Sequence, residues 1–343
     1  MPSGRAPADW STRSDVMVKL TVRHDSFPIA GTFTISRGSK TSVEVVVAEL
    51  EADGMVGRGE CVPYARYGES IDSVMAQIRE FRAGVEAGQD RAALNAVMPA
   101  GAARNALDCA MWDLEAKRSG TPVWRAAGLP QAPTSLVTAY TLSLDTPENM
   151  AAAASRNATR PLFKLKLTGE GDLERVAAVR EAAPDTRLIV DANEGWSAAM
   201  VEPFSEKLSA LGVEMIEQPL PAADDGLLVE LAHPVPLCAD ESAHARDGFE
   251  KLVGKYEMIN IKLDKTGGLT EALALKEAAE SAGMEIMVGC MLATSLGMAP
   301  AFMVAQGAKV VDLDGPLLLA KDREPAFEFE GSTMLPPVAA LWG

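Results

Sequence analysis

The pattern of hydrophobic and polar positions changes near residue 135. From there on, short apolar runs alternate with segments of helical periodicity, which predicts repeated strand–helix units. The predicted strands end near Thr141, Lys166, Asp191, Glu217, Asp240, Lys262, Gly289 and Asp312. Eight such ends predict a closed parallel (β/α) barrel, whose functional residues lie at the carboxyl ends of the strands. An open doubly wound sheet is less favoured, because no glycine-rich phosphate-binding sequence follows the first strand.

The residues before this repeat follow a different pattern. Residues 16–23 and 41–51 alternate β-forming and polar side chains, which predicts a small antiparallel sheet. Residues 27–40 are rich in Gly, Ser and Thr and are expected to form a loop able to fold over a site elsewhere. Helical periodicity follows at residues 71–84 and 103–118. We therefore expect an α+β unit ahead of the barrel.

Composition and charge narrow the possible functions. The 343 residues carry a net charge of −16 without a basic patch, which argues against a nucleic-acid or anionic-membrane partner. No apolar run is long enough to span a bilayer, and residues 1–15 lack the apolar core of a secretion signal, so we expect a flexible extension there. The four cysteines have no CxxC spacing, which argues against a zinc site or disulfides and favours a cytoplasmic protein.

Three consecutive predicted strands each end in a carboxylate, namely Asp191, Glu217 and Asp240. Three carboxylates at one end of a barrel repel one another unless a cation lies among them. A site built only from oxygen ligands is typical of Mg²⁺. Any one of the three is equally well explained as a helix N-cap, but three in succession favour a magnesium site.

Lysines flank this set of carboxylates. Lys164 and Lys166 lie on one face of a predicted strand, where mutual repulsion and burial would both lower an ammonium pKa towards that of a useful base. Protection of an edge strand is the other explanation of such a pair. Lys262 ends the sixth predicted strand and Lys166 the second, on opposite sides of an eight-stranded barrel. A metal-held ligand would therefore face one lysine on each side, as required to remove a proton from one face of a carbon and return it to the other.

The motifs together resemble the muconate-lactonizing subgroup of the enolase superfamily, in particular the bacterial dipeptide epimerases. The motifs are Lys164-Leu165-Lys166, Asp191-Ala192-Asn193-Glu194, Glu217-Gln218-Pro219, Ala239-Asp240-Glu241 and Asn260-Ile261-Lys262. The resemblance implies a modified TIM barrel, (β/α)7β, with an α+β capping domain formed by the N-terminal part and the C-terminal tail. The implied boundaries are 16–127 for the capping domain, joined by 318–343, and 128–317 for the barrel.

The resemblance also implies residue roles. Asp191, Glu217 and Asp240 would bind one Mg²⁺ per subunit, Lys166 and Lys262 would be the two acid/base catalysts, and Lys164 would lie beside the substrate carboxylate. Many relatives carry Glu or Ser after the seventh strand where this chain has Leu292-Ala293-Thr294-Ser295, so no catalytic role is assigned there.

Substrate selection is expected in the remaining loops. Asp312 and Asp314 lie two residues apart after the last strand and so point the same way, which suits the α-ammonium of a dipeptide. Thr141 and Cys290 match positions that line the dipeptide pocket in the family. Arg37 and Lys40 are the available cations for a distal carboxylate, and the resemblance favours Lys40.

The expected function is a Mg²⁺-dependent isomerase, an epimerase acting on the C-terminal residue of L-Ala-D/L-Glu type dipeptides in murein peptide recycling. Alternatives are another dipeptide epimerase, an N-acylamino acid racemase of the same superfamily, or a non-catalytic barrel that binds metal and peptides. The partner is a small dipeptide, and a homo-oligomer is left open.

Overall fold

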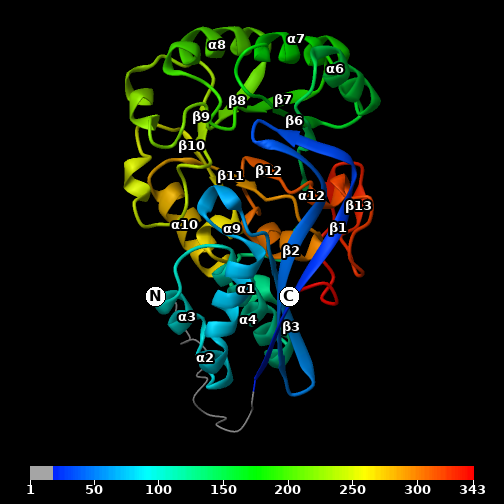
Figure 1. Ribbon diagram of the computed structural model, residues 1–343, viewed down its shortest axis with the longest axis vertical. Helices are drawn as coiled ribbons and strands as arrows, with labels where there is room; N and C mark the ends of the chain where they lie inside the picture. Colours follow the sequence, from blue (N-terminus) through cyan, green and yellow to red (C-terminus); the bar gives the residue numbers. More distant parts are fainter. Residues whose placement is uncertain (1–17) are drawn as a thin grey trace.

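The computed structural model describes residues 18–343 and places an antiparallel sheet with helices beside a parallel barrel (Figure 1). The expected extension at residues 1–15 lies outside the described residues. The sheet consists of β1 (Lys19–Ile35), β2 (Gly38–Ala52) and β3 (Met55–Cys61). The helices and turns that follow are η2 (Ala65–Tyr67), α1 (Ile71–Glu80), α2 (Arg82–Glu86), α3 (Arg91–Val97), α4 (Ala102–Ser119) and α5 (Val123–Ala126).

Close packing of α4 against β3 depends on small residues. A Cβ at Gly59 would lie 2.1 Å from the carbonyl oxygen of Ala106, and one at Gly57 would lie 2.3 Å from that of Ala110. Because both strand positions are glycine and both helix positions are alanine, the helix backbone can approach the strand directly. The C-terminal tail then reaches the same helix, where the indole N–H of Trp342 donates to the carbonyl of Cys109 at 3.1 Å.

The barrel contains eight parallel strands hydrogen-bonded in chain order. They are β5 (Tyr140–Leu142), β6 (Leu162–Lys166), β7 (Arg187–Asp191), β8 (Val213–Glu217), β9 (Leu237–Ala239), β10 (Met258–Ile261), β11 (Glu285–Gly289) and β12 (Val310–Asp312). The N–H of Ala139, just before β5, donates to the carbonyl of Val311 in β12 at 2.8 Å and so joins the first strand to the last. The predicted fold class is confirmed, and each predicted strand end lies within one residue of the observed one.

The helices of the barrel are α6 (Pro147–Arg156), α7 (Asp172–Ala182), α8 (Ala198–Ala210), α9 (Leu263–Thr266), α10 (Leu269–Ser281), α11 (Ser295–Val304) and α12 (Gly315–Leu318). A helix was expected between every pair of strands, and this was wrong after β8 and β9. The 3-10 turns η3 (Asp225–Glu230) and η4 (Phe249–Lys251) lie there instead. The segment after η3 contains Pro234 and Pro236, which a helix interior disfavours, and η4 is flanked by Gly248 and Gly254, both with left-handed φ. A small three-stranded sheet is formed by β4 (Leu136–Val137), β13 (Phe329–Glu330) and β14 (Thr333–Met334).

The loop expected at residues 27–40 is a β-hairpin. β1 and β2 pair across this segment, with a shift in register between Pro28 and Phe33, and the turn lies at Ser36 and Arg37. The Gly, Ser and Thr content of the segment does not predict strand pairing, because the pairing register is set between two long strands and not by local composition. In Figure 1 the hairpin, in blue, extends from the antiparallel sheet to the ends of β6 and β7. It therefore does reach over the mouth of the barrel.

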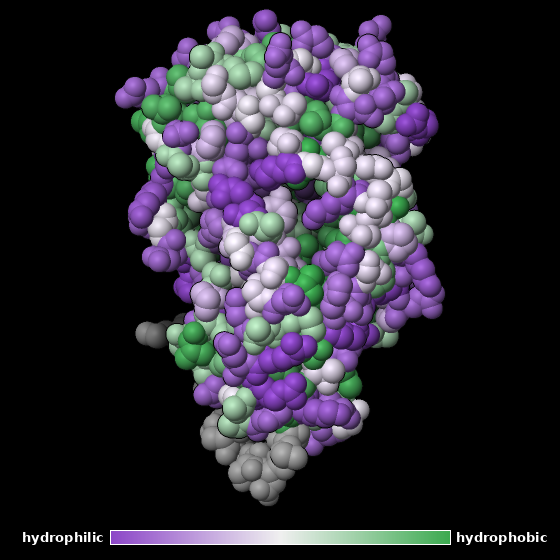
Figure 2. Space-filling model, in the orientation of Figure 1, coloured by the Kyte–Doolittle hydropathy of each residue, from purple (hydrophilic) through white to green (hydrophobic). Residues whose placement is uncertain are grey.

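The visible surface shows no large apolar area, since hydrophobic residues are scattered among hydrophilic ones (Figure 2). None of the helices within residues 18–343 is both long and apolar enough to cross a membrane.

Candidate active site

Three buried carboxylates lie at the carboxyl ends of consecutive barrel strands. Asp191 ends β7, Glu217 ends β8, and Asp240 directly follows β9. Asp191 and Glu217 are direct partners in the β7–β8 register. Parallel pairing thus brings the three side chains to one end of the barrel, as their positions in the sequence suggested.

Two lysines of β6 contact these carboxylates from one side. Nζ of Lys164 lies 2.7 Å from Oε2 of Glu217 and 3.3 Å from Oδ2 of Asp191. Nζ of Lys166 lies 2.6 Å from that same Oδ2. The strand is internal to the barrel and both lysines are buried, so protection of an exposed edge does not explain the pair.

Two further lysines contact the third carboxylate. Lys262 follows β10, which β7, β8 and β9 separate from β6, and its Nζ lies 2.7 Å from Oδ2 of Asp240. Nζ of Lys265 lies 2.6 Å from Oδ1 of Asp240 and donates to the carbonyl of Asn260 at 3.0 Å. The sequence reasoning missed Lys265, although it lies one helical turn after Lys262 in a matching motif.

The donor set suits a divalent cation chemically, because carboxylate oxygens are the ligands that Mg²⁺ prefers. Within residues 18–343, however, no three acidic, histidine or cysteine side chains form a ready cluster of metal ligands. The ammonium group of Lys164 contacts both Asp191 and Glu217, and that of Lys166 pairs with Asp191. The three carboxylates therefore fit a divalent cation by donor type and burial, whereas in this structure the lysine ammonium groups provide the compensating positive charge.

The expected lowering of a lysine pKa was wrong for Lys164. Burial by itself lowers the pKa of this ammonium group, but Asp312, Glu217 and Asp191 outweigh it and raise the pKa well above its ordinary value. The same balance between burial and Asp240 raises the pKa of Lys262. The prediction counted the neighbouring lysine and burial but left out the carboxylates on the adjoining strands.

The pKa values of Asp191 and Glu217 shift in opposite directions. Burial raises the pKa of Asp191, but Lys166 and Lys164 lower it more, to about 2. Burial and the charge of Asp191 raise the pKa of Glu217 to about 7. Glu217 is therefore the carboxylate whose charge the lysines compensate least.

The predicted substrate-binding residues surround the other side of the mouth. Oδ2 of Asp312 accepts from Nζ of Lys164 at 2.8 Å, whereas its buried Oδ1 has no hydrogen-bond partner. Oδ2 of Asp314 accepts from the backbone N–H of Thr141 at 2.6 Å. Burial and Asp312 raise the pKa of Asp314 to about 7. Cys290 follows β11 and is half-buried.

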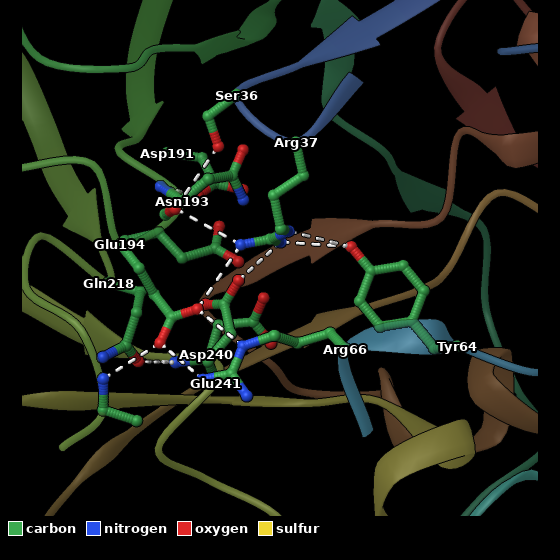
Figure 3. Close-up of polar contacts among 12 residues, drawn as sticks. Ser36, Arg37, Tyr64, Arg66, Asp191, Asn193, Glu194, Gln218, Asp240 and Glu241 are labelled. Atoms are coloured by element: carbon green, nitrogen blue, oxygen red, sulfur yellow. Dashed lines mark hydrogen bonds and ion pairs between the residues drawn. The ribbon is translucent and has the colours of Figure 1, made fainter. Parts of the chain in front are cut away.

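The tip of the β1–β2 hairpin is fastened over the mouth by Arg37 (Figure 3). Nη2 of Arg37 donates to Oε1 of Glu241 at 2.7 Å and to Oη of Tyr64 at 3.1 Å, and Nη1 donates to the carbonyl of Asn193 at 3.3 Å. Lys40 is exposed on β2, and its predicted role is not tested by these contacts. Arg37 is thus the hairpin cation that lies against the barrel loops.

Glu194 joins the barrel to the turn η2 of the N-terminal part. Its carboxylate accepts two hydrogen bonds from Arg66, each of 2.9 Å, and one of 2.9 Å from the N–H of Ala222. Asn193 and Glu194 both have left-handed backbones, with φ of 48° and 63°, which costs free energy for residues other than glycine. The Asp191–Glu194 motif does not predict this partner, because Arg66 lies 128 residues away in the chain.

We expect removal of the Glu241 carboxylate to loosen the hairpin tip. The change Glu241→Ala removes the shortest contact of Arg37, and a hydrogen bond between charged groups contributes about 1.5–3 kcal/mol. Trypsin should therefore cleave after Arg37 about tenfold faster or more. The matched control is Glu44→Ala, which removes contacts to His24 and Ser26 on the same hairpin. Equal cleavage rates in the two variants would show that Arg37 does not hold the tip.

A buried carboxyl between the two parts of the molecule predicts a pH dependence of stability. Burial raises the pKa of Asp264 to about 7, although the N–H of Val62 and Nδ2 of Asn105 donate to it. The folded state then binds a proton more tightly than the unfolded state, so this carboxyl stabilises at low pH and loses that contribution as pH rises through about 7. In Asp264→Asn, the difference in unfolding free energy between pH 5.5 and pH 8 should shrink by about 2 kcal/mol. Denaturant titrations at both pH values measure this, and an unchanged difference would contradict it.

Comparison with known proteins places these features in a family. Residues 17–128 match the N-terminal domain model of mandelate racemase / muconate lactonizing enzyme, and residues 149–337 match the enolase C-terminal domain-like model. The chain is 48% identical over 315 residues to an L-Ala-D/L-Glu epimerase of Escherichia coli (strain K12), covering 91% of this chain and 98% of that one. It is 46% identical over 307 residues to an N-acetyl-D-glutamate racemase of a Pseudoalteromonas species, covering 88% and 95%.

Solved structures agree with this. An enolase family member from Agrobacterium tumefaciens, with bound sodium and L-Ala-L-Glu, superimposes with a TM-score of 0.94 at 52% identity, covering 95% of this chain and all of that one. A dipeptide epimerase from Enterococcus faecalis, in complex with Mg and L-Leu-L-Tyr, superimposes with a TM-score of 0.87 at 28% identity, covering 94% and 97%. The named relatives are epimerases and racemases, so the prediction of an isomerase is confirmed. The chain belongs to the mandelate racemase / muconate lactonizing family of the enolase superfamily.

Proposed function

We propose that the protein is a Mg²⁺-dependent dipeptide epimerase that moves the α-proton of the C-terminal residue in L-Ala-D/L-Glu type dipeptides. The observation that carries the proposal is the pairing of Lys166 with Asp191 and of Lys262 with Asp240, on strands four apart in the barrel. A carbon held between the two lysine side chains has a proton carrier on each face, one lysine taking the proton as a neutral amine and the other returning one as an ammonium group. This is the arrangement that inversion at that carbon requires.

Asp191, Glu217 and Asp240 would hold one Mg²⁺, which when bound stabilises the second negative charge that develops on the substrate carboxylate. Lys166 would remove or return the α-proton at one face, and Lys262 would do so at the other. Lys164 is buried and cationic between Asp312 and Glu217, so it would bind the substrate carboxylate through its ammonium group. The buried surroundings exclude water and strengthen each of these electrostatic interactions.

Asp312 and Asp314 would hold the α-ammonium of the dipeptide. Support comes from the buried Oδ1 of Asp312, which has no hydrogen-bond partner and would accept from an ammonium group. Thr141 and Cys290 would line the same pocket. For a distal carboxylate, Lys40 stays the predicted residue, and Arg37 is a second candidate because its guanidinium lies at the barrel loops, where it is paired with Glu241.

N-acylamino acid racemisation is the second candidate, because a relative of almost equal identity is an N-acetyl-D-glutamate racemase. Both reactions need the same two lysines and differ in the group attached to the amino nitrogen. A free ammonium favours two nearby carboxylates, whereas an acetyl group gains nothing from them. The acid pair at Asp312 and Asp314 therefore favours the dipeptide.

Solvent exchange tests the proposal. In D₂O with Mg²⁺, L-Ala-L-Glu should gain deuterium at the glutamate α-carbon and convert to L-Ala-D-Glu, as followed by NMR and chiral chromatography. Chelation of the metal should stop both. N-acetyl-L-glutamate, tested in parallel, should react more slowly, and the reverse order would favour the second candidate. No exchange with any member of a dipeptide library or with N-acyl amino acids would leave only a non-catalytic binding barrel.

Cytoplasmic location, a role in murein peptide recycling, a homo-oligomer and the domain boundaries drawn from the sequence stay predictions.

A further inference from the structure

A buried carboxamide, Gln218, fixes the turn that carries Asp240. Gln218 directly follows Glu217 and is fully buried. Its Oε1 accepts from the backbone N–H of Asp240 at 2.9 Å and from that of Ser242 at 3.1 Å. Its Nε2 donates to the carbonyl of Leu220 at 2.9 Å. One side chain thus ties the end of β8 to the residues that follow β9.

The backbone of Gln218 is itself unusual. Its φ is 37°, a left-handed value that costs free energy for a residue with a Cβ and persists only where surrounding contacts hold it. The hydroxyl of Tyr256 lies 3.0 Å from Nε2 and contacts Asp225 at 3.3 Å, so the carboxamide is held in turn by a second layer of polar groups. These contacts let Glu217 enter the barrel mouth while its neighbour turns towards β9.

A second buried carboxamide, Asn260 of β10, holds Glu217 itself. Its Nδ2 donates to Oε1 of Glu217 at 2.7 Å. Space for it comes from Gly289 on β11, where a Cβ would lie 2.6 Å from Oδ1 of Asn260 and 2.8 Å from Nδ2. The φ of Gly289 is not left-handed, so glycine is required here by the close approach of the Asn260 carboxamide and not by a turn.

We propose that Gln218 and Asn260 are positioning residues for the metal site, an inference that rests on the proposed function. Asn260 fixes one oxygen of Glu217 and so sets the direction of the other, and Gln218 fixes the backbone that carries Asp240. Both carboxamides are neutral, so they orient the carboxylates without competing for their negative charge as a lysine does. Partners of this kind typically contribute 10–100-fold to metal affinity.

The test measures Mg²⁺ binding by isothermal titration calorimetry in the absence of substrate. Gln218→Met and Asn260→Leu keep the approximate side-chain volume and remove the hydrogen bonds, and each should weaken Mg²⁺ binding by about 10–100-fold. The matched control is Gln306→Met. Gln306 follows α11, and its carboxamide also forms hydrogen bonds with backbone groups, in this case of Thr134 and Phe302. Its Mg²⁺ affinity should equal that of the parent.

Circular dichroism identifies any variant that does not fold. Gly289→Ala then provides the independent measurement, since it displaces the Asn260 carboxamide without deleting a polar group and should also weaken Mg²⁺ binding. Parent-like affinity in the folded variants, including Gly289→Ala, would overturn the positioning roles while leaving the proposed function intact. Absence of Mg²⁺ binding in the parent protein would instead overturn the proposed metal site, and this inference with it.

Discussion

Replacing Lys262 by alanine should slow interconversion of the two dipeptide stereoisomers, lowering kcat by roughly 10²–10⁴-fold, the usual contribution of a positioned acid or base. The effect should be asymmetric. Lys166 remains paired with Asp191 on the other side of the mouth, so the isomer whose α-proton faces Lys166 should still exchange that proton with solvent. In D₂O, one stereoisomer should therefore gain deuterium without inversion, whereas the other should be inert.

The pattern of exchange separates catalysis from a loss of structure. Lys276→Ala is the matched control, because Lys276 lies in the outer helix α10, is largely buried, and donates to the carbonyls of Val304 and Gln306 at the end of α11 and not to the strand-end carboxylates. Its activity should stay close to that of the parent. Unchanged turnover in Lys262→Ala would refute the two-lysine arrangement, and equal loss of exchange from both isomers would show that Lys262 does more than serve one face.

The parts of the site that the sequence predicted are those that depend on strand ends. An apolar run that stops at a charged residue marks where a buried strand leaves the core, so Asp191 and Glu217 could be located to the residue. Parallel pairing then makes consecutive strand ends neighbours without further information. The same reasoning located Lys166 and Lys262 on strands four apart, which is a property of strand order alone.

The parts that the sequence did not predict depend on distances between side chains far apart in the chain. Arg37 meets Glu241 across 204 residues, and neither residue belongs to a periodic pattern that would pair them. The prediction for the pKa of Lys164 was wrong for the same reason. The direction of its shift depends on which carboxylates of other strands come within about 3 Å of the ammonium group. The sequence of the strand indicates that Lys164 is buried and close to Lys166, but it does not show the carboxylates of other strands that compensate the charge of Lys164.

Replacing Asp191 by asparagine should have the second largest effect. The change keeps the size of the side chain but removes a negative charge that Lys166 and Lys164 contact at 2.6 and 3.3 Å. It also exchanges one carboxylate of the proposed metal site for a weaker ligand, and a metal ion contributes several kcal/mol to stabilising a developing oxyanion. We expect kcat/KM to fall on the order of 10³-fold and Mg²⁺ affinity to fall with it.

A matched buried carboxylate makes this result specific. Asp113 is fully buried in α4, pairs with Lys117 at 2.7 Å and accepts from the N–H of Arg58 and of Gly343, all outside the barrel mouth. Asp113→Asn should lower the melting temperature and leave both kcat/KM and Mg²⁺ affinity near those of the parent. If Asp191→Asn bound Mg²⁺ and turned over dipeptide as the parent does, the three strand-end carboxylates would not form the metal site. Their convergence would then serve only to hold the lysines, and the proton transfer would need another source of charge stabilisation.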